Sequence, residues 1–166
     1  AGSRTAFYID VWHALRPLSD QDRLAQLDAI AAWAGIRPSP RSSHRTMTSA
    51  EVRQLARLPG LDVGAHSVTH SHLPSLAEEG QRREIRDSRV FLEQLLERPI
   101  GTFSYPFTEN NAAIRAMTRD EGFVAAVGGL TTAVEPSADL FELPRFDVKA
   151  CRGEAFEKRL ERWFVE

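Results

Sequence analysis

Three of the five histidines in the chain occur together, in the stretch LDVGAHSVTHSHL at positions 61 to 73. His66 and His70 are four residues apart and directly follow a short apolar run that ends at Ala65. Side chains four apart in a helical turn share one face, so both imidazoles can reach a single ion. Neutral imidazole is a good ligand for Zn²⁺ and similar divalent metals. The pattern therefore fits a metal site, but it equally fits two histidines that are merely hydrogen-bonded near the surface.

Two histidines are too few ligands for a catalytic zinc, which usually has three protein ligands and a water. His72 follows two residues after His70, and we expect it to lie on the surface rather than to be the third ligand. His13 and His44 occur in no supporting pattern. Cys151 is the single cysteine, which excludes an intrachain disulfide and a cysteine-based zinc site.

Length and composition predict one soluble globular domain, since the chain has 166 residues, 42% of them hydrophobic and 27% charged. The formal net charge of −2 gives no electrostatic reason to expect binding to nucleic acid or to an anionic membrane. No apolar run approaches the ~20 residues needed to span a bilayer. No signal-peptide pattern is visible at the start of the sequence. Compartment and oligomeric state are not indicated.

The first 46 residues predict a helical hairpin followed by a loop rich in proline, serine and arginine. Apolar residues recur at helical spacing from Thr5 to Arg16, and Pro17 ends this first helix. Ser19 is the expected N-cap of a second helix, which Gly35 ends. We expect the three tryptophans of the chain to be core residues, with sugar stacking as the alternative role for any one of them; they are Trp12, Trp33 and Trp163.

After position 46, strand patterns alternate with helical ones, which favours an α/β fold built from parallel βα units. Functional groups in such folds lie at the carboxyl ends of the strands, where His66 and His70 occur. The expected strands are 61–65, 102–107, 123–127 and 142–148. The expected helices start at the capping boxes Thr48–Glu51 and Ser75–Glu78 and at Asn111, and a closing helix carries Phe156, Leu160, Trp163 and Phe164.

A second cluster, FSYPF at 103–107, also lies at the end of an expected strand. On its own it predicts an aromatic core strand closed by a proline turn. The combination of HSVTH with GTFSYPF, however, resembles the polysaccharide deacetylases of the NodB-homology type, carbohydrate esterase family 4. The family motif H-[ST]-x-x-H is matched by residues 66–70. Its proline-containing strand motif is matched by 103–107, with Thr108 where glycine is usual, and the resemblance is best from about 47 to 148.

The resemblance implies a distorted parallel (β/α) barrel, of which residues 47–166 would form the C-terminal portion, with 1–46 as an insertion seen in one subgroup. It implies hydrolysis of acetyl groups on a polysaccharide or a lipid-linked sugar. It also implies a divalent metal, for which we expect zinc, held by His66, His70 and an aspartate. The backbone N–H of Phe107 is implied as an oxyanion donor. Arg145 is a candidate for binding substrate or orienting a carboxylate, and its alternative role is a structural ion pair.

The sequence departs from the family in lacking the Thr-Phe-Asp-Asp-Gly motif, which supplies the catalytic base and the metal-binding aspartate. No Asp-Asp pair occurs in the chain, so we expect that motif upstream of Ala1 and expect this chain alone to be inactive. Of the carboxylates present, Asp62 is expected to point to the wrong end of its strand, whereas Glu109 and Asp147 lie nearer.

Three hypotheses follow from these observations. The first is a metal-dependent carbohydrate deacetylase, represented here without its catalytic base. The second is a non-catalytic carbohydrate-binding or interaction module that keeps the same fold. The third is a structural α/β segment without a metal, in which the rings of His66 and His70 would point apart.

Overall fold

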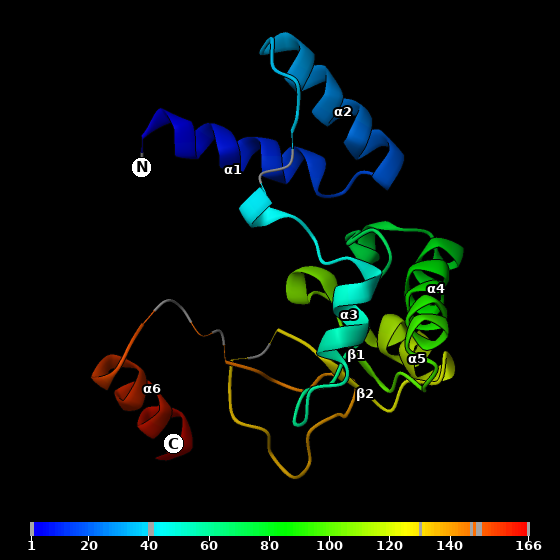
Figure 1. Cartoon of the computed structure of the whole chain (residues 1–166), viewed down its shortest axis with the longest axis vertical. Coiled ribbons are helices and arrows are strands. Elements are labelled where there is room, and N and C mark those ends of the chain that lie inside the picture. The colour runs from blue at the N-terminus through cyan, green and yellow to red at the C-terminus, as the bar shows by residue number, and fades with distance from the viewer. Residues whose placement is uncertain (1, 40–41, 130, 147, 149–150, 166) are drawn as a thin grey trace.

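The computed structural model describes residues 2–39, 42–129, 131–146, 148 and 151–165. Figure 1 shows a helical hairpin at one end of the molecule, a central part containing both strands, and a last helix that lies apart. The helices are α1 (Ser3–Leu15), α2 (Asp20–Trp33), α3 (Ser49–Leu55), α4 (Glu78–Leu96), α5 (Ala112–Asp120) and α6 (Glu154–Val165), the strands are β1 (Thr102–Ser104) and β2 (Ala125–Val127), and 3₁₀ turns lie at Ser42–His44, Leu73–Ser75 and Pro106–Thr108.

The sheet pairs β1 and β2 in parallel, with Phe103 aligned with Ala126. Single parallel bridges extend this ladder on both sides, from Ala65 to Phe103 and from Leu143 to Val127. Four extended segments therefore run parallel in chain order, with α4 and α5 in the first two connections. This mixed helix-and-strand arrangement with parallel pairing agrees with the predicted α/β class.

The predicted strands are longer than those in the structure. Segments 61–65 and 142–148 contribute only the bridges at Ala65 and Leu143, and Asp147 lies outside the described residues. The Val63 N–H donates to the Asp62 carboxylate at 2.8 Å, so this backbone donor does not pair with a neighbouring strand. The strand predicted at 102–107 ends at Ser104, because a 3₁₀ turn that begins at Pro106 follows it.

Side-chain caps start the helices in three of the four predicted places, one of which is Ser19 at the start of α2. Thr48 Oγ1 accepts from the Glu51 N–H at 3.3 Å and the Glu51 carboxylate accepts from the Thr48 N–H at 2.7 Å, so this capping box is confirmed. Asn111 Oδ1 caps α5 through the Ile114 N–H at 2.9 Å. The box predicted at Ser75 is wrong: Ser75 belongs to a 3₁₀ turn, and α4 begins three residues later at Glu78.

The hydrophobic core lies between β1, β2, α4 and α5. The ring of Phe103 contacts Tyr105 and Phe123, with centroids 5.3 and 5.2 Å apart. The Tyr105 hydroxyl donates to the Phe141 carbonyl at 2.9 Å, which satisfies the one polar atom of that buried side chain. The buried members of this core are Ala65, Leu73, Ile85, Ile100, Phe103, Tyr105, Ile114, Met117, Phe123, Ala126 and Phe141.

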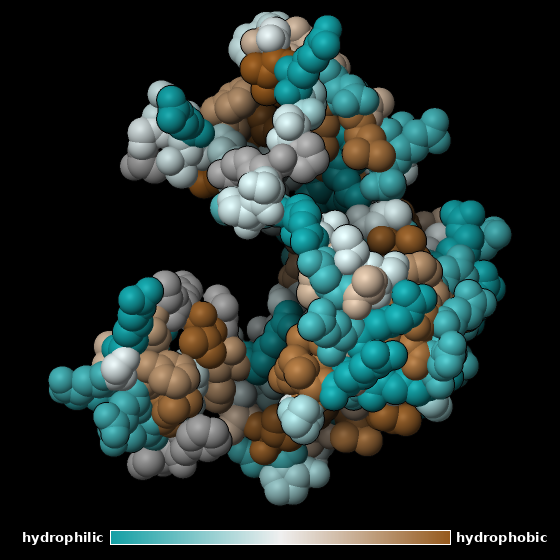
Figure 2. Space-filling model, viewed as in Figure 1, coloured by the Kyte–Doolittle hydropathy of each residue, from teal (hydrophilic) through white to brown (hydrophobic). Residues whose placement is uncertain are grey.

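The hairpin of α1 and α2 is present as predicted, including the Ser19 cap, but it does not join this core. Helix α1 has no buried residue, and Ala31 is the buried residue of α2. Trp33 is 82% exposed, so the prediction of a core role for it is wrong. Trp163 stacks on Phe146 with centroids 4.6 Å apart. Hydrophobic side chains accordingly reach the surface over the hairpin in Figure 2.

A helix long and apolar enough to cross a bilayer does not occur in the described ranges.

Candidate active site

The backbone of the sheet fixes the start of the histidine loop. The Ala65 N–H donates to Thr102 O, and the Ser104 N–H donates to Ala65 O, both at 2.9 Å. Gly64 allows this close approach, because a Cβ at that position would lie 2.5 Å from Thr102 Oγ1. His66 therefore leaves the sheet from a defined point beside the end of β1.

The histidines lie on a loop held by α4, not on the helical turn that their spacing suggested. Ser67 and His70 have φ of 62° and 55°, in the left-handed region that costs a non-glycine residue on the order of 1 kcal/mol. Glu84 holds the loop in this shape: one carboxylate oxygen accepts from the N–H groups of Val68 and Thr69, both at 2.9 Å. The other oxygen accepts from Thr69 Oγ1 at 2.8 Å.

This loop brings the two predicted ligands together. The ring centroids of His66 and His70 are 4.8 Å apart, with the ring planes at 75°. His66 Nδ1 lies 2.6 Å from the Ser104 carbonyl, which can only accept, so Nδ1 carries a proton and Nε2 is the nitrogen whose lone pair a neutral ring offers to a metal. Burial, and next the neighbouring His66, lower the pKa of His70, which favours the neutral imidazole that a metal requires.

The described residues supply no third ligand, since no group of three His, Cys, Asp or Glu side chains able to hold a metal occurs among them. His72 is not the surface residue we predicted: its side chain is 14% exposed. Its two ring nitrogens contact Ser75 Oγ at 2.5 Å and Glu109 Oε2 at 2.7 Å. Asp62 pairs with Arg98 at 2.7 Å, in keeping with its predicted place away from the site.

The turn at Phe107 lies against the histidines, with its ring centroid 4.7 Å from that of His70. Phe107 and Thr108 have φ of 58° and 62°, so Thr108 adopts the left-handed conformation that glycine would favour. The described backbone bonds of the turn run from Thr108 N–H to Tyr105 O at 3.0 Å and from Glu109 N–H to Pro106 O at 3.2 Å. Neither bond uses the Phe107 N–H.

Arg145 reaches the same end of β1 from the last extended segment. Its guanidinium donates to Ser104 Oγ at 3.0 Å, while the carbonyl of Ser104 accepts from His66. The structure thus places His66, His70, Phe107 and Arg145 around the carboxyl end of β1, which is where parallel βα folds carry their functional groups.

The hairpin adds residues that we did not predict. Arg16 pairs with Glu109, and its guanidinium carbon lies 5.1 Å from the centroids of both Trp12 and Phe107. Arg23 of α2 donates to Thr69 O in the histidine loop at 2.7 Å. Nothing in the sequence signals these contacts, because residues far apart in the chain form them and neither arginine occurs in a motif.

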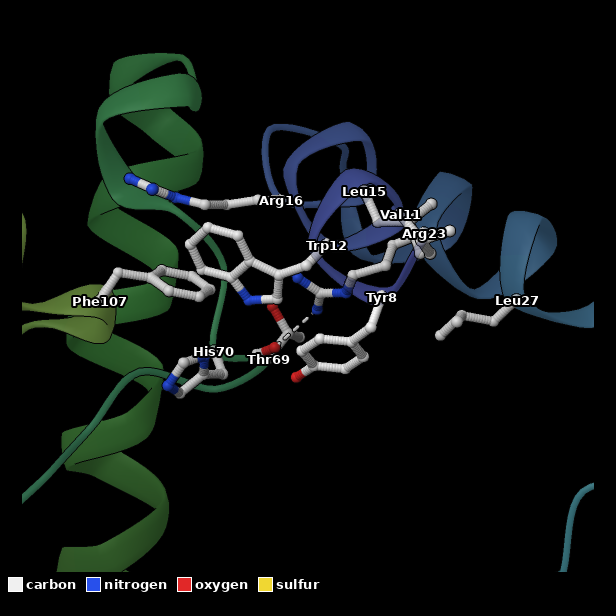
Figure 3. A pocket seen from close by; sticks show the side chains of 10 residues that line it. All are labelled: Tyr8, Val11, Trp12, Leu15, Arg16, Arg23, Leu27, Thr69, His70 and Phe107. Atoms are coloured by element: carbon white, nitrogen blue, oxygen red, sulfur yellow. Dashed lines mark hydrogen bonds between the residues drawn. The ribbon is translucent and has the colours of Figure 1, made fainter. Parts of the chain in front are cut away.

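A cavity of about 390 Å³ lies between the hairpin and the histidine loop. Figure 3 shows α1 on one side of it and Thr69, His70 and Phe107 on the other. Trp12 lines this cavity, so it is not the core residue that we predicted. The lining residues are Tyr8, Val11, Trp12, Leu15, Arg16, Arg23, Leu27, Thr69, His70 and Phe107.

Comparisons with known proteins identify the family and the fold. Residues 12–126 match the sequence family described as polysaccharide deacetylase. Among solved structures, the deacetylase PplD of Streptococcus pyogenes, in a complex with acetate, is similar with a TM-score of 0.60 and 19% identity, over 64% of this chain and 47% of that one. The polysaccharide deacetylase BC0361 of Bacillus cereus has a TM-score of 0.54 and 19% identity, over 63% of this chain and 33% of that one.

The chain therefore spans about half the length of the first of these structures and a third of the second. A comparison with curated proteins found no match. Both structural matches show the fold, and the sequence family covers the hairpin from Trp12 as well as the histidine loop and β1. Because residues 12–126 match the model of this family, the chain belongs to the polysaccharide deacetylase family.

Proposed function

We propose that this chain is part of a metal-dependent hydrolase that removes acetyl groups from a carbohydrate, either a polysaccharide or a lipid-linked sugar. The observation that carries the proposal is the convergence of His66 and His70, with centroids 4.8 Å apart, beside the Phe107 turn. Membership of the polysaccharide deacetylase family supports the choice of reaction. The short distance between the rings of His66 and His70 argues against a purely structural segment, in which the two rings would point apart.

The residues present fit a divalent metal in two of its positions. The carbonyl of Ser104 orients His66 through Nδ1 and leaves Nε2 to coordinate, an arrangement common among metal-binding histidines. Zinc suits imidazole ligands combined with one carboxylate. We assign the third ligand and the catalytic base to an Asp-Asp pair outside these 166 residues, and this chain alone is expected to be inactive.

The proposal extends to the architecture. Ala65 lies at one edge of the described sheet, because it pairs with Phe103 on one side. A further parallel strand on its other side would continue the sheet towards a distorted (β/α) barrel, in which residues 47–166 form the C-terminal portion. Residues 1–46 then form a separate hairpin and loop inserted beside the site.

The residues of this chain would have distinct roles in the reaction. A divalent ion bound here would lower the pKa of a water ligand towards ~7 and polarise the acetyl carbonyl. The Phe107 N–H would donate to the oxyanion that develops on that carbonyl, and such a donor contributes about 3 kcal/mol of transition-state stabilisation. Arg145, anchored on Ser104, would contact the hydroxyl groups of the substrate.

The whole protein provides the test, by acetate release from acetylated oligosaccharides and by metal content of the purified protein. His66→Ala and His70→Ala each remove one ligand, so we expect loss of bound metal and a fall in activity of at least ~100-fold. His44→Ala is the matched control, because His44 is exposed and bonded to Ser43. Full activity in either ligand variant would refute the site.

One observation favours a second candidate, a non-catalytic carbohydrate-binding or interaction module: the described residues contain no third metal ligand. The two candidates differ in the whole protein. A module would bind oligosaccharide without releasing acetate, and its binding would survive removal of metal by a chelator. A deacetylase would lose acetate release on chelation and regain it when zinc is added back.

A further inference from the structure

Helix α1 presents an aromatic face to the cavity beside the candidate metal site. Tyr8 and Trp12 are four residues apart, share one side of the helix and both line the cavity, as Figure 3 shows. Tyr8 is 67% exposed, and α1 has no buried residue at all. This aromatic face therefore contributes nothing to the hydrophobic core, and its concave setting is typical of a ligand site.

We infer that the hairpin forms a saccharide subsite, in which Tyr8 and Trp12 hold an uncharged sugar ring next to the acetylated sugar. The inference rests on the proposed function, because it places the occupant as the neighbouring unit of the same substrate. His70 and Phe107 line the cavity as well, so a ring bound there directly adjoins the groups proposed to act on the acetyl group.

The chemistry of the lining matches a pyranose. A sugar ring has an apolar C–H face, which stacks on aromatic side chains, and a rim of hydroxyl groups, which need hydrogen-bond partners. Arg23 can supply donors, because both of its described bonds, to Asp20 and to Thr69 O, use the same terminal nitrogen. A guanidinium has five N–H groups, so the other nitrogens of Arg23, a residue that lines the cavity, have donors without a described bond.

The charges around the cavity favour a neutral occupant. Arg16 is paired with Glu109, and Arg23 is paired with Asp20 at 2.7 Å. Each cation at the rim thus has its own carboxylate, and an anionic sugar would have to compete with both pairs. Walls formed by Val11, Leu15 and Leu27 add apolar surface but no charge.

The test compares long and short substrates with the whole protein. Tyr8→Ala removes an exposed ring, and Trp12→Phe keeps most of the packing against Arg16 and Phe107. We expect each variant to raise KM for a long N-acetylated chitooligosaccharide about tenfold, with kcat little changed. Turnover of nitrophenyl acetate, which is too small to fill the subsite, reports on the acetyl site alone, so the ratio of oligosaccharide to nitrophenyl acetate turnover measures the subsite. Trp33→Ala is the matched control, because Trp33 is 82% exposed and does not line this cavity.

Direct binding of the same oligosaccharide, measured by calorimetry, separates this inference from the proposed function. If the parent releases no acetate from any acetylated substrate, the proposed function fails, but weaker binding in Tyr8→Ala than in Trp33→Ala still supports the subsite. Unchanged KM and unchanged binding in both cavity variants overturn the subsite. A lower melting temperature in Tyr8→Ala with unchanged binding would likewise overturn it, because the cavity would then be a packing surface for another part of the protein.

Discussion

The histidine loop and the N-terminal hairpin face each other across one cavity, yet the protein holds them in different ways. The loop is fixed by backbone bonds to β1 and by three hydrogen bonds to Glu84 of α4. The hairpin contacts the rest of the site through Arg16, which pairs with Glu109, and through Arg23, which donates to Thr69 O. One side of the cavity is therefore built on the core, and the other is attached to it by two arginines and by the contact of Trp12 with Phe107, whose ring centroids lie 5.9 Å apart.

This difference in attachment suits the two sides to different roles, metal coordination for the histidine loop and substrate binding for the hairpin. Metal coordination tolerates little displacement, so its residues belong on the most rigid support that the fold offers. An ion pair with an exposed carboxylate, such as that of Arg16 with Glu109, contributes on the order of 1 kcal/mol or less, so the hairpin can open locally at low cost in free energy. We expect the hairpin to move during substrate binding while the histidine loop stays in place.

The largest expected difference in the free energy of unfolding is between replacing a buried apolar residue of the core and an exposed one of the hairpin. Phe103 is buried at the centre of the core, and Phe103→Ala should destabilise the protein by about 3–5 kcal/mol, because it leaves a cavity that the sheet cannot fill. Leu24 of α2 is 53% exposed, and Leu24→Ala should cost less than about 1 kcal/mol. Urea unfolding of both variants measures the difference, and equal losses would show that the hairpin belongs to the core.

A smaller difference in stability is expected within α4, between replacing a residue that holds the histidine loop and replacing one that does not. Glu84→Gln keeps the size of the side chain but replaces one acceptor oxygen by an NH₂ group. We expect about 2 kcal/mol of destabilisation, because the charge-assisted bonds to the loop become weaker neutral ones and one acceptor oxygen is lost. The two left-handed residues of the loop would then relax.

Metal content and urea unfolding of the whole protein check this expectation, with Asp87→Asn as the control. Asp87 is exposed on the same helix, and its side chain contacts the adjacent Arg86. Normal metal content in Glu84→Gln would show that the loop holds its shape without the carboxylate.

The sequence was most informative where local chemistry decides the structure. Caps at Ser19, Thr48 and Asn111 start helices because each side chain accepts a hydrogen bond from an N–H three residues on. The failure at Ser75 has the same kind of cause: Pro74 lies in a 3₁₀ turn, and Ser75 contacts His72 instead. Strand lengths were overestimated, because a strand needs neighbouring strands and the sequence of one segment does not reveal them.

The site shows the same limit. The motif spacing predicted that His66 and His70 lie together, and their ring centroids are 4.8 Å apart, with Phe107 beside them at the end of the turn after β1. The contribution of Arg16 could not be predicted, because its partner Glu109 belongs to a turn that only the tertiary fold brings near. Trp33 illustrates the opposite error, since a large apolar residue was assigned to a core that does not extend to the hairpin.

The smallest predicted effect concerns the joint between the two regions and its dependence on pH. The hydrogen bond from His72, and next that from Arg16, lower the pKa of Glu109 from its ordinary value of 4.5. A carboxylate with a lowered pKa in the folded state stabilises that state fully above pH 4.5 and ceases to do so as the pH falls through the folded value. Acidification should therefore loosen the hairpin, by well under about 1 kcal/mol because the Glu109 side chain is 46% exposed.

Glu109→Gln tests this joint, because it removes the charge at every pH. Amide exchange in α1, corrected for intrinsic rates, should be faster in the variant than in the parent at neutral pH, by a factor of about two to three. The two proteins should converge well below pH 4.5, where the parent carboxylate is also neutral. Glu79→Gln controls for the loss of a charge, since Glu79 is exposed on α4 and is not a partner of Arg16 or Arg23. Equal protection of α1 in parent and variant at neutral pH would mean that Arg16 holds the hairpin through its contacts with Trp12 and Phe107, and not through the ion pair.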